Sequence, residues 1–512
     1  MRFYDRQDEM AQLRALSKAA DRKAVICVIT GVRRVGKTEL VKEFFKKDDG
    51  LYFFADNSKT SSQHLSEFSE KLRQRTGSSE RMATRTWDDF FNDLFEAGKR
   101  QKLIVAFDEF QRFSTIDRGV PFSLQQHFDL HRADSKLLIL LSGSSFGMLM
   151  RMFIGQDAPL FQRPSNTIHL RQFDFQTVCT VLEDLGVKSF ADKVELYALF
   201  GGIPKYYDLL EDYSVANADD ALEKMVFNTQ APLRDEVKSV IMEEFGKETA
   251  TYYGILCAAA FGKTKANEIA DCAGIKATSL APYLFDLTEL LGALKKELPV
   301  TEDIKSKKAR YYLDNNFFKT WFRFIHKNRA EIELGRFDGL LQQFKREKEA
   351  FTGPAFESVC CQYLAKTASF DRLGKWWGKE RKNTAGNEVS SLKENRFSSK
   401  SYAKTPRSEA NSKPEETGAK AGNSIEIDLV GLDEKNSTAT FSECKWQEKP
   451  PSIADLERLR QKARSVNWKN GVRVEKFVIF SKTPFGSKTT EYAKHSNFTL
   501  VSLKELERGM TE

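Results

Sequence analysis

Gly31-Val32-Arg33-Arg34-Val35-Gly36-Lys37-Thr38 is the stretch of this 512-residue chain that most restricts its architecture, because it completes a G-x-x-x-x-G-K-[ST] loop. The apolar run Val25 to Thr30 precedes it and a helical pattern follows. The glycines allow a tight turn, so that backbone N–H groups and a helix N-terminus face a polyphosphate. We predict that all eight residues bind nucleotide, with Lys37 reaching the β- and γ-phosphates and Thr38 holding Mg²⁺. A chance glycine-rich turn is the alternative, but strand, loop and helix occur in the required order.

The composition is that of a globular protein, with 41% hydrophobic and 12% aromatic residues and a length that suggests about three domains. The net charge is +8, and residues 381–424 alone hold nine basic and five acidic side chains, so global charge argues little for nucleic acid. The charged start Met1 to Arg6 does not resemble a signal peptide, and no apolar run approaches the length of a bilayer span. We expect a cytoplasmic protein without a membrane partner. The seven cysteines form no C-x-x-C pair, which predicts reduced thiols.

Four further apolar runs alternate with helical stretches along the first third of the chain: Leu51 to Ala55, Leu103 to Phe107, Leu137 to Leu141 and Thr167 to Leu170. Short runs rich in Val, Ile, Leu and Phe are typical of a buried parallel sheet that is covered by helices. The predicted fold class is therefore α/β, with ligands bound at the carboxyl ends of the strands.

Polar residues follow two of these predicted strands. Asp108 is predicted to orient the Mg²⁺ of the nucleotide, and Glu109 to accept a proton from attacking water, which favours hydrolysis over simple binding. A solvated acidic strand end is the alternative. After the fourth run, Ser144 or Ser145 is predicted to sense the γ-phosphate, although serine and glycine clusters also form ordinary loops.

Two later phrases carry a family resemblance. With the loop, Pro159-Leu160-Phe161-Gln162-Arg163 and Gly201-Gly202-Ile203-Pro204-Lys205-Tyr206 make the chain similar to archaeal-type ATPases of the AAA+/STAND P-loop group. The resemblance implies ATP as the nucleotide, an ATPase core at residues 1–172 and a helical lid at 173–246. The family usually has glycine where Gln162 stands. Arg163 is therefore either a γ-phosphate-sensing finger or a structural salt bridge.

Residues 247–314 change in pattern to two short helices joined by a turn at Gly274, followed by a hairpin from Lys295 to Tyr312. This order predicts a winged helix. Its hairpin tip carries Lys305, Lys307, Lys308 and Arg310. These basic residues favour contact with DNA phosphates; a protein-docking or packing module, or a merely solvated basic loop, is the alternative. Residues 315–352 are predicted to be an aromatic-rich helical connector whose rings pack in the core.

A second group of chemically active residues lies in residues 353–512. Thr352-Gly353-Pro354 predicts a helix start, and Glu357 lies at the edge of that helix's apolar face. Asp428 and Glu443 lie on two predicted neighbouring strands and are expected to bind one Mg²⁺, with Lys445 on the same face as Glu443 to position water. This D…E-x-K spacing resembles the PD-(D/E)xK nuclease superfamily, which implies a small restriction-endonuclease-like domain in which Glu357 also belongs to the site. Residues 379–424 are predicted to be a disordered insertion.

Two functions follow from these patterns. The first is an ATPase whose nucleotide state controls the placement of the winged helix and the Mg²⁺-dependent nuclease module on DNA. The second is a STAND-type signalling or scaffolding switch, in which the C-terminal domain binds DNA or protein without cleaving it and the chain forms a homo-oligomer or binds a protein partner. A P-loop transferase is a third class, for which the sequence shows no acceptor-binding feature.

Overall fold

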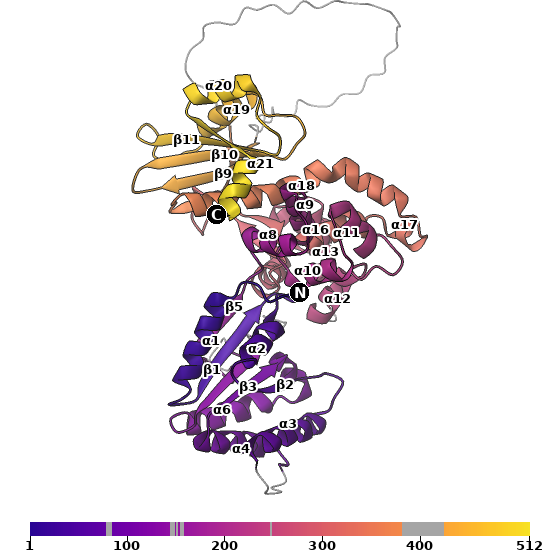
Figure 1. The fold of residues 1–512 in the computed structure, drawn as a ribbon, viewed down its shortest axis with the longest axis vertical. Coiled ribbons are helices and arrows are strands. Elements are labelled where there is room, and N and C mark those ends of the chain that lie inside the picture. Colours follow the sequence, from indigo (N-terminus) through magenta and orange to yellow (C-terminus); the bar gives the residue numbers. More distant parts are fainter. Residues whose placement is uncertain are drawn as a thin grey trace, which may run out of the picture.

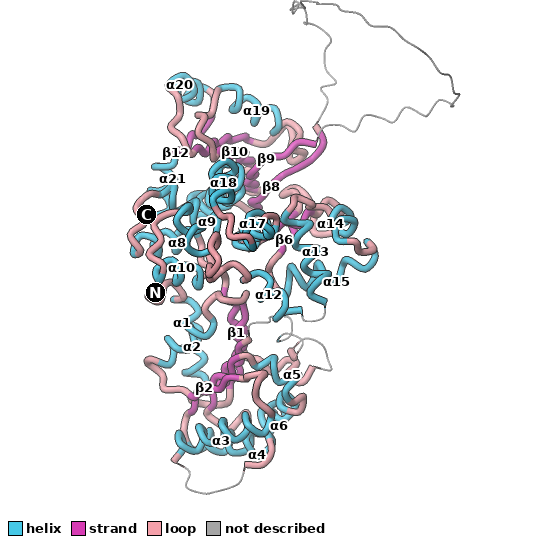
Figure 2. The backbone as a smooth tube through the Cα atoms, turned by 90° about the vertical axis from the view of Figure 1, so that its right-hand side faces the viewer, coloured by secondary structure: helices cyan, strands magenta, loops and turns pink. Residues whose placement is uncertain are grey.

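The computed structural model describes residues 1–77, 84–143, 149, 152–153, 158–245, 248–380 and 424–511, with Leu290 described by its backbone alone. The parts follow one another along the longest axis of the molecule, with the N-terminal sheet at one end, helices in the middle and the C-terminal sheet at the other end (Figure 1). Figure 2 shows the same separation of the two sheets from a perpendicular view. Within the described residues, no helix combines the length and the apolar character that crossing a bilayer requires.

The N-terminal part is built on a parallel five-stranded sheet with the order β2-β3-β4-β1-β5, which confirms all five predicted strands. Strand β1 is buried along its whole length. Ile26 and Val28 pack on the face covered by α3, α4 and α6, whereas Val25, Cys27 and Ile29 pack on the face covered by α1 and α2. The elements are α1 Gln7–Ala19, β1 Val25–Gly31, α2 Lys37–Phe45, β2 Leu51–Phe54, α3 Ser61–Thr76, α4 Trp87–Arg100, β3 Leu103–Asp108, η1 Phe110–Arg112, α5 Phe113–Ile116, α6 Val120–His131, β4 Leu137–Ser142 and β5 Asn166–Leu170.

The middle of the chain is helical and is followed by one short hairpin. Strands β6 and β7 pair antiparallel after five helical elements between Thr249 and Leu290, so helices precede a hairpin as the sequence predicts. We refer to residues 249–313 as the helix–hairpin unit. The elements are α8 Phe175–Asp184, α9 Phe190–Phe200, α10 Pro204–Asp212, α11 Ala218–Met225, α12 Glu236–Phe245, α13 Thr249–Ala260, α14 Ala266–Ala273, η3 Ala277–Ser279, α15 Leu280–Phe285, η4 Asp286–Leu290, β6 Leu294–Glu297 and β7 Arg310–Leu313.

Helix α18, Asp338–Thr367, corrects the prediction of a helix start at Thr352. The helix runs without interruption through Gly353 and Pro354. Strong helix formers precede this pair, and buried residues on both sides of it, Phe344 and Phe356, pack in one hydrophobic core, so tertiary packing outweighs the cost of an internal proline. The aromatic rings at Phe317, Phe318, Trp321, Phe322 and Phe324 are buried in the same core. They lie on α16 Asn316–Thr320 and the π-helical η5 Trp321–His326, which α17 Arg329–Glu333 follows.

The C-terminal domain is a mixed sheet with the order β12-β11-β10-β9-β8, in which β8, β9 and β10 pair antiparallel and β10, β11 and β12 pair parallel. Helix α18 contacts one face, and α19 and α20 cover the other. Lys379, the last residue of β8, and Ser424, the first residue of β9, are register partners. Residues 381–423 of the expected insertion lie outside the described residues. The elements are β8 Arg372–Lys379, β9 Ser424–Asp433, β10 Thr438–Lys445, α19 Ile453–Ala463, β11 Val474–Ser481, α20 Ser487–His495, β12 Phe498–Ser502 and α21 Leu503–Thr511.

Candidate functional site

The loop from Gly31 to Thr38 joins the carboxyl end of β1 to the start of α2. Gly31 has φ 143°, and a Cβ atom there would lie 2.5 Å from the carbonyl oxygen of Leu170, so only glycine fits. Gly36 caps α2 with φ 96° and offers no side-chain acceptor to the helix. The backbone N–H groups of the first turn of α2 are therefore available to an anion.

Lys37 folds back onto the loop that carries it. Its Nζ donates to the carbonyl oxygens of Gly31 at 2.8 Å and Val32 at 3.1 Å, and the residue is 6% exposed. Burial lowers the pKa of Lys37 to about 8, and the negative charges of Glu109, Asp108 and Glu244 oppose this shift. The ammonium thus lies in a dry environment beside three carboxylates, at the place where the motif predicts phosphate.

Asp108 accepts hydrogen bonds from the first turn of α2 and from two strands of the sheet. The Thr38 hydroxyl donates to its Oδ2 at 2.8 Å, the Tyr52 hydroxyl donates to the same oxygen at 2.5 Å, and Ser142 donates to its Oδ1 at 2.6 Å. Strand β4 lies between β1 and β3, which brings these groups to one sheet edge. A threonine hydroxyl beside a carboxylate is a donor set that suits Mg²⁺ bound to nucleotide phosphates.

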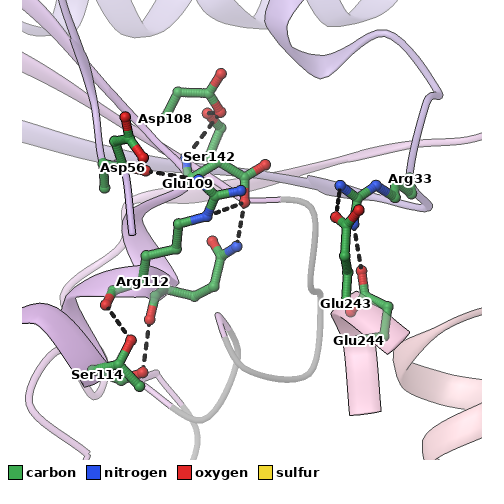
Figure 3. Close-up of polar contacts among 12 residues, drawn as sticks. Arg33, Asp56, Asp108, Glu109, Arg112, Ser114, Ser142, Glu243 and Glu244 are labelled. Carbon is green, nitrogen blue, oxygen red and sulfur yellow. Dashed lines mark hydrogen bonds and ion pairs between the residues drawn. The ribbon is translucent and has the colours of Figure 1, made fainter. Parts of the chain in front are cut away.

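Glu109 directly follows β3 and has a left-handed backbone, with φ 57°. Its Oε2 accepts a hydrogen bond from Gln111 at 2.5 Å and lies 3.5 Å from Nε of Arg112. Figure 3 shows this carboxylate beside Arg112, close to Asp108 and Ser142. The neighbours hold Glu109 at the same sheet edge as the loop, where a proton acceptor for water is predicted.

Three further predictions for the nucleotide site concern the serines after β4, Arg163 and Gln162. Ser144 and Ser145 lie outside the described residues, whereas Ser142, two positions earlier, contacts Asp108. Arg163 forms an ion pair with Asp129 at 2.9 Å, which is the structural alternative considered for it. Gln162 has φ 57°, so the backbone keeps a conformation that favours the glycine usual at this position.

The two arginines of the loop contact α12. Arg33 forms an ion pair with Glu243, and its NH1 lies 3.8 Å from Oε1 of Glu244 (Figure 3). Arg34, with φ 66°, forms an ion pair with the buried Glu236 at the other end of the helix. Helix α12 is therefore bound to the loop at both of its ends.

The segment from Gly201 to Tyr206 packs against Glu236, the residue of α12 that pairs with Arg34. A Cβ atom on Gly202 would lie 1.9 Å from the carbonyl oxygen of Phe173, so the chain approaches here too closely for any other residue. Helix α10 then begins at Pro204 and buries Tyr206, whose hydroxyl donates to Glu236 at 3.4 Å. The phrase thus positions the acceptor of Arg34.

In the C-terminal domain the predicted carboxylates come together. The backbone N–H of Cys444 donates to Oδ2 of Asp428 at 2.8 Å, and Lys445 donates to Oε2 of Glu443 at 2.7 Å. Asp428 is half-buried, and burial together with the charges of Glu443 and Glu357 raises its pKa to about 7. The three carboxyl groups of Asp428, Glu443 and Glu357 therefore share one electrostatic environment.

Two further lysines in this group were missed by sequence reasoning. Lys462 on α19 donates to Oε1 of Glu443 at 2.5 Å, and Lys375 on β8 donates to Oε2 of Glu357 at 2.5 Å. Neither residue is part of a short motif, because each reaches the group from an element that is distant in sequence. The nucleotide site shows the same difference between local and distant signals. The motif identified Lys37, whereas only the parallel pairing of β2 with β3 brings Tyr52 to Asp108.

The hairpin of the helix–hairpin unit lies against the C-terminal sheet. The Val300 N–H donates to the carbonyl oxygen of Lys375 at 2.9 Å, and the Arg310 guanidinium lies over the ring of Trp377. Lys308 pairs with Glu302 within the hairpin, at 2.7 Å. A cavity of 1180 Å³ adjoins this contact and extends to Val32, with Lys319 and Glu357 in its lining.

The parallel sheet, the loop that ends in Lys37 and Thr38, and Asp108 at the end of β3 define a P-loop ATPase. Residues 3–210 match a family described as an ATPase domain predominantly from Archaea, and residues 321–463 match one described as archaeal and bacterial proteins of unknown function. The uncharacterized protein MJECL04 of Methanocaldococcus jannaschii is 30% identical over 387 residues, which cover 73% of this chain and 82% of that protein. The chain belongs to this family of archaeal-type ATPases.

Solved structures with a similar fold include the Walker-type ATPase of Pyrococcus abyssi, with 18% identity, a TM-score of 0.47, and coverage of 63% of this chain and 96% of that one. Another is the Orc1 protein of Aeropyrum pernix in complex with DNA, with 13% identity, a TM-score of 0.31, and coverage of 67% and 95%. Both TM-scores are below 0.5, so the family assignment rests on the sequence matches.

Proposed function

We propose that ATP binding and hydrolysis at the P-loop control a Mg²⁺-dependent nuclease-like site in the C-terminal domain, and that this site acts on DNA. The observation that carries the proposal is the convergence of Asp428, Glu443 and Lys445 on two neighbouring strands. The proposal also draws on the physical connection between the two sites, since the helix–hairpin unit contacts Val32 through Gly292 and β8 through Val300.

The residues of the C-terminal group fit a Mg²⁺ ion of the kind that phosphoryl-transfer enzymes use. Within the described part of the chain, no three His, Cys, Asp or Glu side chains form a metal-holding group. We infer that two carboxylates, Asp428 and Glu443, would hold the ion, and that water and substrate phosphate would complete its coordination, as Mg²⁺ commonly requires. The ion would supply Lewis-acid polarisation of the scissile phosphate.

The side chains divide the remaining work of phosphodiester hydrolysis. Water forms a bond to phosphorus, the bond to the leaving sugar oxygen breaks, and the proton lost by water is balanced by the one that the leaving oxygen gains. Lys445 would orient the attacking water from beside Glu443. Lys375, paired with Glu357, would limit the repulsion between this carboxylate and the DNA phosphate.

At the P-loop, the chain's own residues would perform the hydrolysis of ATP. Lys37 would turn from its own loop carbonyls to the β- and γ-phosphates, and the first N–H groups of α2 would bind the same oxygens. Glu109 would accept the proton of the attacking water. Mg²⁺ would be held by Thr38 and oriented by Asp108.

The direct test is DNA cleavage by the full chain on supercoiled, linear duplex and single-stranded DNA, with Mg²⁺ or EDTA and with no nucleotide, ATP or ADP. We expect Mg²⁺-dependent cleavage that changes with the nucleotide and is lost in Asp428→Ala and Lys445→Ala. Lys476→Ala, at an exposed lysine on neighbouring β11, is the matched control and should cleave normally. Absence of cleavage under every condition would rule out the nuclease part.

One observation favours a signalling or scaffolding switch as a second candidate. Both oxygens of Glu443 already accept hydrogen bonds from lysines, Lys445 and Lys462, which is an arrangement that a binding surface can keep permanently. This candidate predicts slow ATP turnover, a nucleotide-dependent oligomeric state in light scattering, and unchanged DNA or protein binding in Asp428→Ala. Loss of binding in that variant would count against it.

A further inference from the structure

Arg33 and Arg34 have no necessary role in the general chemistry of a P-loop, where backbone N–H groups and the lysine bind the phosphates. In this chain both guanidinium groups lie on the loop itself and are 23% and 31% exposed. Their partners, Glu243, Glu244 and Glu236, all belong to α12. A helix far along the chain thus supplies carboxylates directly to the predicted phosphate-binding loop.

Glu244 contributes to this negative charge in two ways. Its side chain is 6% exposed, and one oxygen lies 3.8 Å from Arg33. Its charge also acts on the buried ammonium of Lys37, together with the charges of Asp108 and Glu109. The C-terminal end of α12 therefore brings a carboxylate to the same basic groups that a polyphosphate would need.

Glu236 attaches the N-terminal end of α12 to the loop, and it is held more firmly than Glu243 at the C-terminal end. It is buried, it pairs with Arg34, and it accepts a hydrogen bond from Tyr206. Glu243 is half exposed, with 51% of its side-chain surface accessible, so its pair with Arg33 can open at little cost. The two ends of α12 therefore differ in how easily they leave the loop.

We propose that the carboxylates of Glu243 and Glu244 compete with the phosphates of ATP for Arg33, so that α12 sets the nucleotide affinity and its C-terminal end leaves the loop when ATP binds. This inference rests on the proposed binding of ATP at the P-loop. A guanidinium that pairs with phosphate must give up its carboxylate partners, and the carboxylates repel the incoming anion. Arg34 and Glu236 remain paired when ATP binds, so the N-terminal end of α12 stays attached to the loop while its C-terminal end moves away.

The competition has a definite consequence for nucleotide selectivity. ATP carries one phosphate more than ADP, so the negative charge at α12 opposes ATP more strongly than ADP. Neutralising the two carboxylates should therefore favour ATP over ADP. A merely structural role of α12 does not predict this difference, because loss of a stabilising contact would affect both nucleotides alike.

The test measures the Kd of a slowly hydrolysed ATP analogue and of ADP by calorimetry for the full chain. We expect Glu243→Gln/Glu244→Gln to bind the ATP analogue about 3- to 10-fold more tightly, which corresponds to ordinary ion-pair energies, and ADP by a smaller factor. Glu223→Gln, at an exposed glutamate on α11, is the matched control and should bind both nucleotides as the wild type does. Equal or weaker binding of the ATP analogue by the double variant would overturn the proposal.

A second comparison separates this inference from the proposed nucleotide site. Arg33→Gln should weaken binding of the ATP analogue and should cancel the gain from the two glutamine substitutions when all three are combined. If the double variant does not fold, Glu243→Gln alone, at a half-exposed position, carries the same expectation. Wild-type protein that binds no better than Lys37→Ala would refute the nucleotide site itself. Normal wild-type binding that none of the glutamine substitutions tightens would refute only the competition.

Discussion

Arg310 on β7 and Glu426 on β9 form an ion pair of 3.0 Å that joins the helix–hairpin unit to the C-terminal sheet. The same guanidinium lies 4.5 Å from the centre of the Trp377 ring. Of the basic residues expected to contact DNA phosphates, Arg310 pairs with the C-terminal sheet and Lys308 pairs with Glu302 inside the hairpin. The hairpin thus packs against the C-terminal sheet, and contact of its basic residues with DNA stays a prediction.

We predict that Arg310→Ala loosens this contact. The substitution removes an ion pair and a cation–π contact, which together contribute about 1 to 2 kcal/mol when partly buried. Hydrogen exchange of β8 and of residues 298–313 should increase, whereas the N-terminal sheet should be unaffected. Lys307→Ala, at an exposed position of the same hairpin, is the control. Equal exchange in the two variants would show that Arg310 does not hold the contact.

At the nucleotide site, Glu109→Gln should still bind ATP but hydrolyse it about 100- to 10,000-fold more slowly, because an amide cannot accept the proton of water. Lys37→Ala should lose ATP binding altogether. Phosphate release and calorimetry measure the two effects separately. A Glu109→Gln protein that hydrolyses ATP at the wild-type rate would remove Glu109 from the role of proton acceptor.

Lys319 gives a prediction about pH. Burial lowers the pKa of Lys319 to about 8 from its ordinary value of 10.5, so the folded protein loses this proton before the unfolded chain does. The contribution of Lys319 to the free energy of unfolding is therefore most unfavourable below about pH 8 and is relieved as the pH rises toward 10.5.

Lys319→Met should therefore stabilise the protein at about pH 7, and its advantage should shrink at about pH 9.5. Urea denaturation at the two pH values measures the change. Lys476→Met, at an exposed lysine, should follow the wild type. An advantage of Lys319→Met that is the same at both pH values would indicate a packing effect in place of a charge effect.

Gly353→Ala tests the continuity of α18. Apart from the adjacent residues and the backbone of the same helix, no heavy atom lies within 4 Å of a Cβ atom at this position. Alanine therefore adds helix propensity without a clash and should raise the free energy of unfolding by about 0.5–1 kcal/mol. Gly339→Ala, equally uncrowded but in the first turn, should gain less. A destabilised Gly353→Ala protein would indicate that the helix is interrupted there.

The N-terminal sheet was predictable because four of its strands are short, strongly apolar runs and the fifth, β5, is a weaker one. The P-loop motif fixes the position of Lys37 and Thr38 after the first strand. The contacts of Arg33 and Arg34 were not predictable, because their partners lie about 200 residues later on a helix with ordinary acidic residues. Sequence reasoning missed Lys375 and Lys462 because only the packing of α18 on β8 and of α19 on β10 brings them to their carboxylates.

The error at Thr352 has a different cause. Gly-Pro is a valid signal for the end or start of a helix, but the signal is local, and the hydrophobic residues on both sides of it belong to one core. Asp428 and Glu443 lie in the opposite situation: period-two alternation places each on a strand face, and the antiparallel pairing of β9 with β10 then brings the two strands together.

Because α18 belongs to two parts of the molecule at once, those parts are not independent modules. A fragment that begins at residue 353 would cut the helix near its middle. It would keep the contact of Phe356 with Trp446 but lose Phe344 and Phe351, which pack in the same core. A fragment that begins at Asp338 would keep the whole helix but lose the rings of Phe324 that pack on Phe344 and Phe351. Exchange of the C-terminal domain between relatives should therefore succeed only when residues 315–367 are exchanged with it.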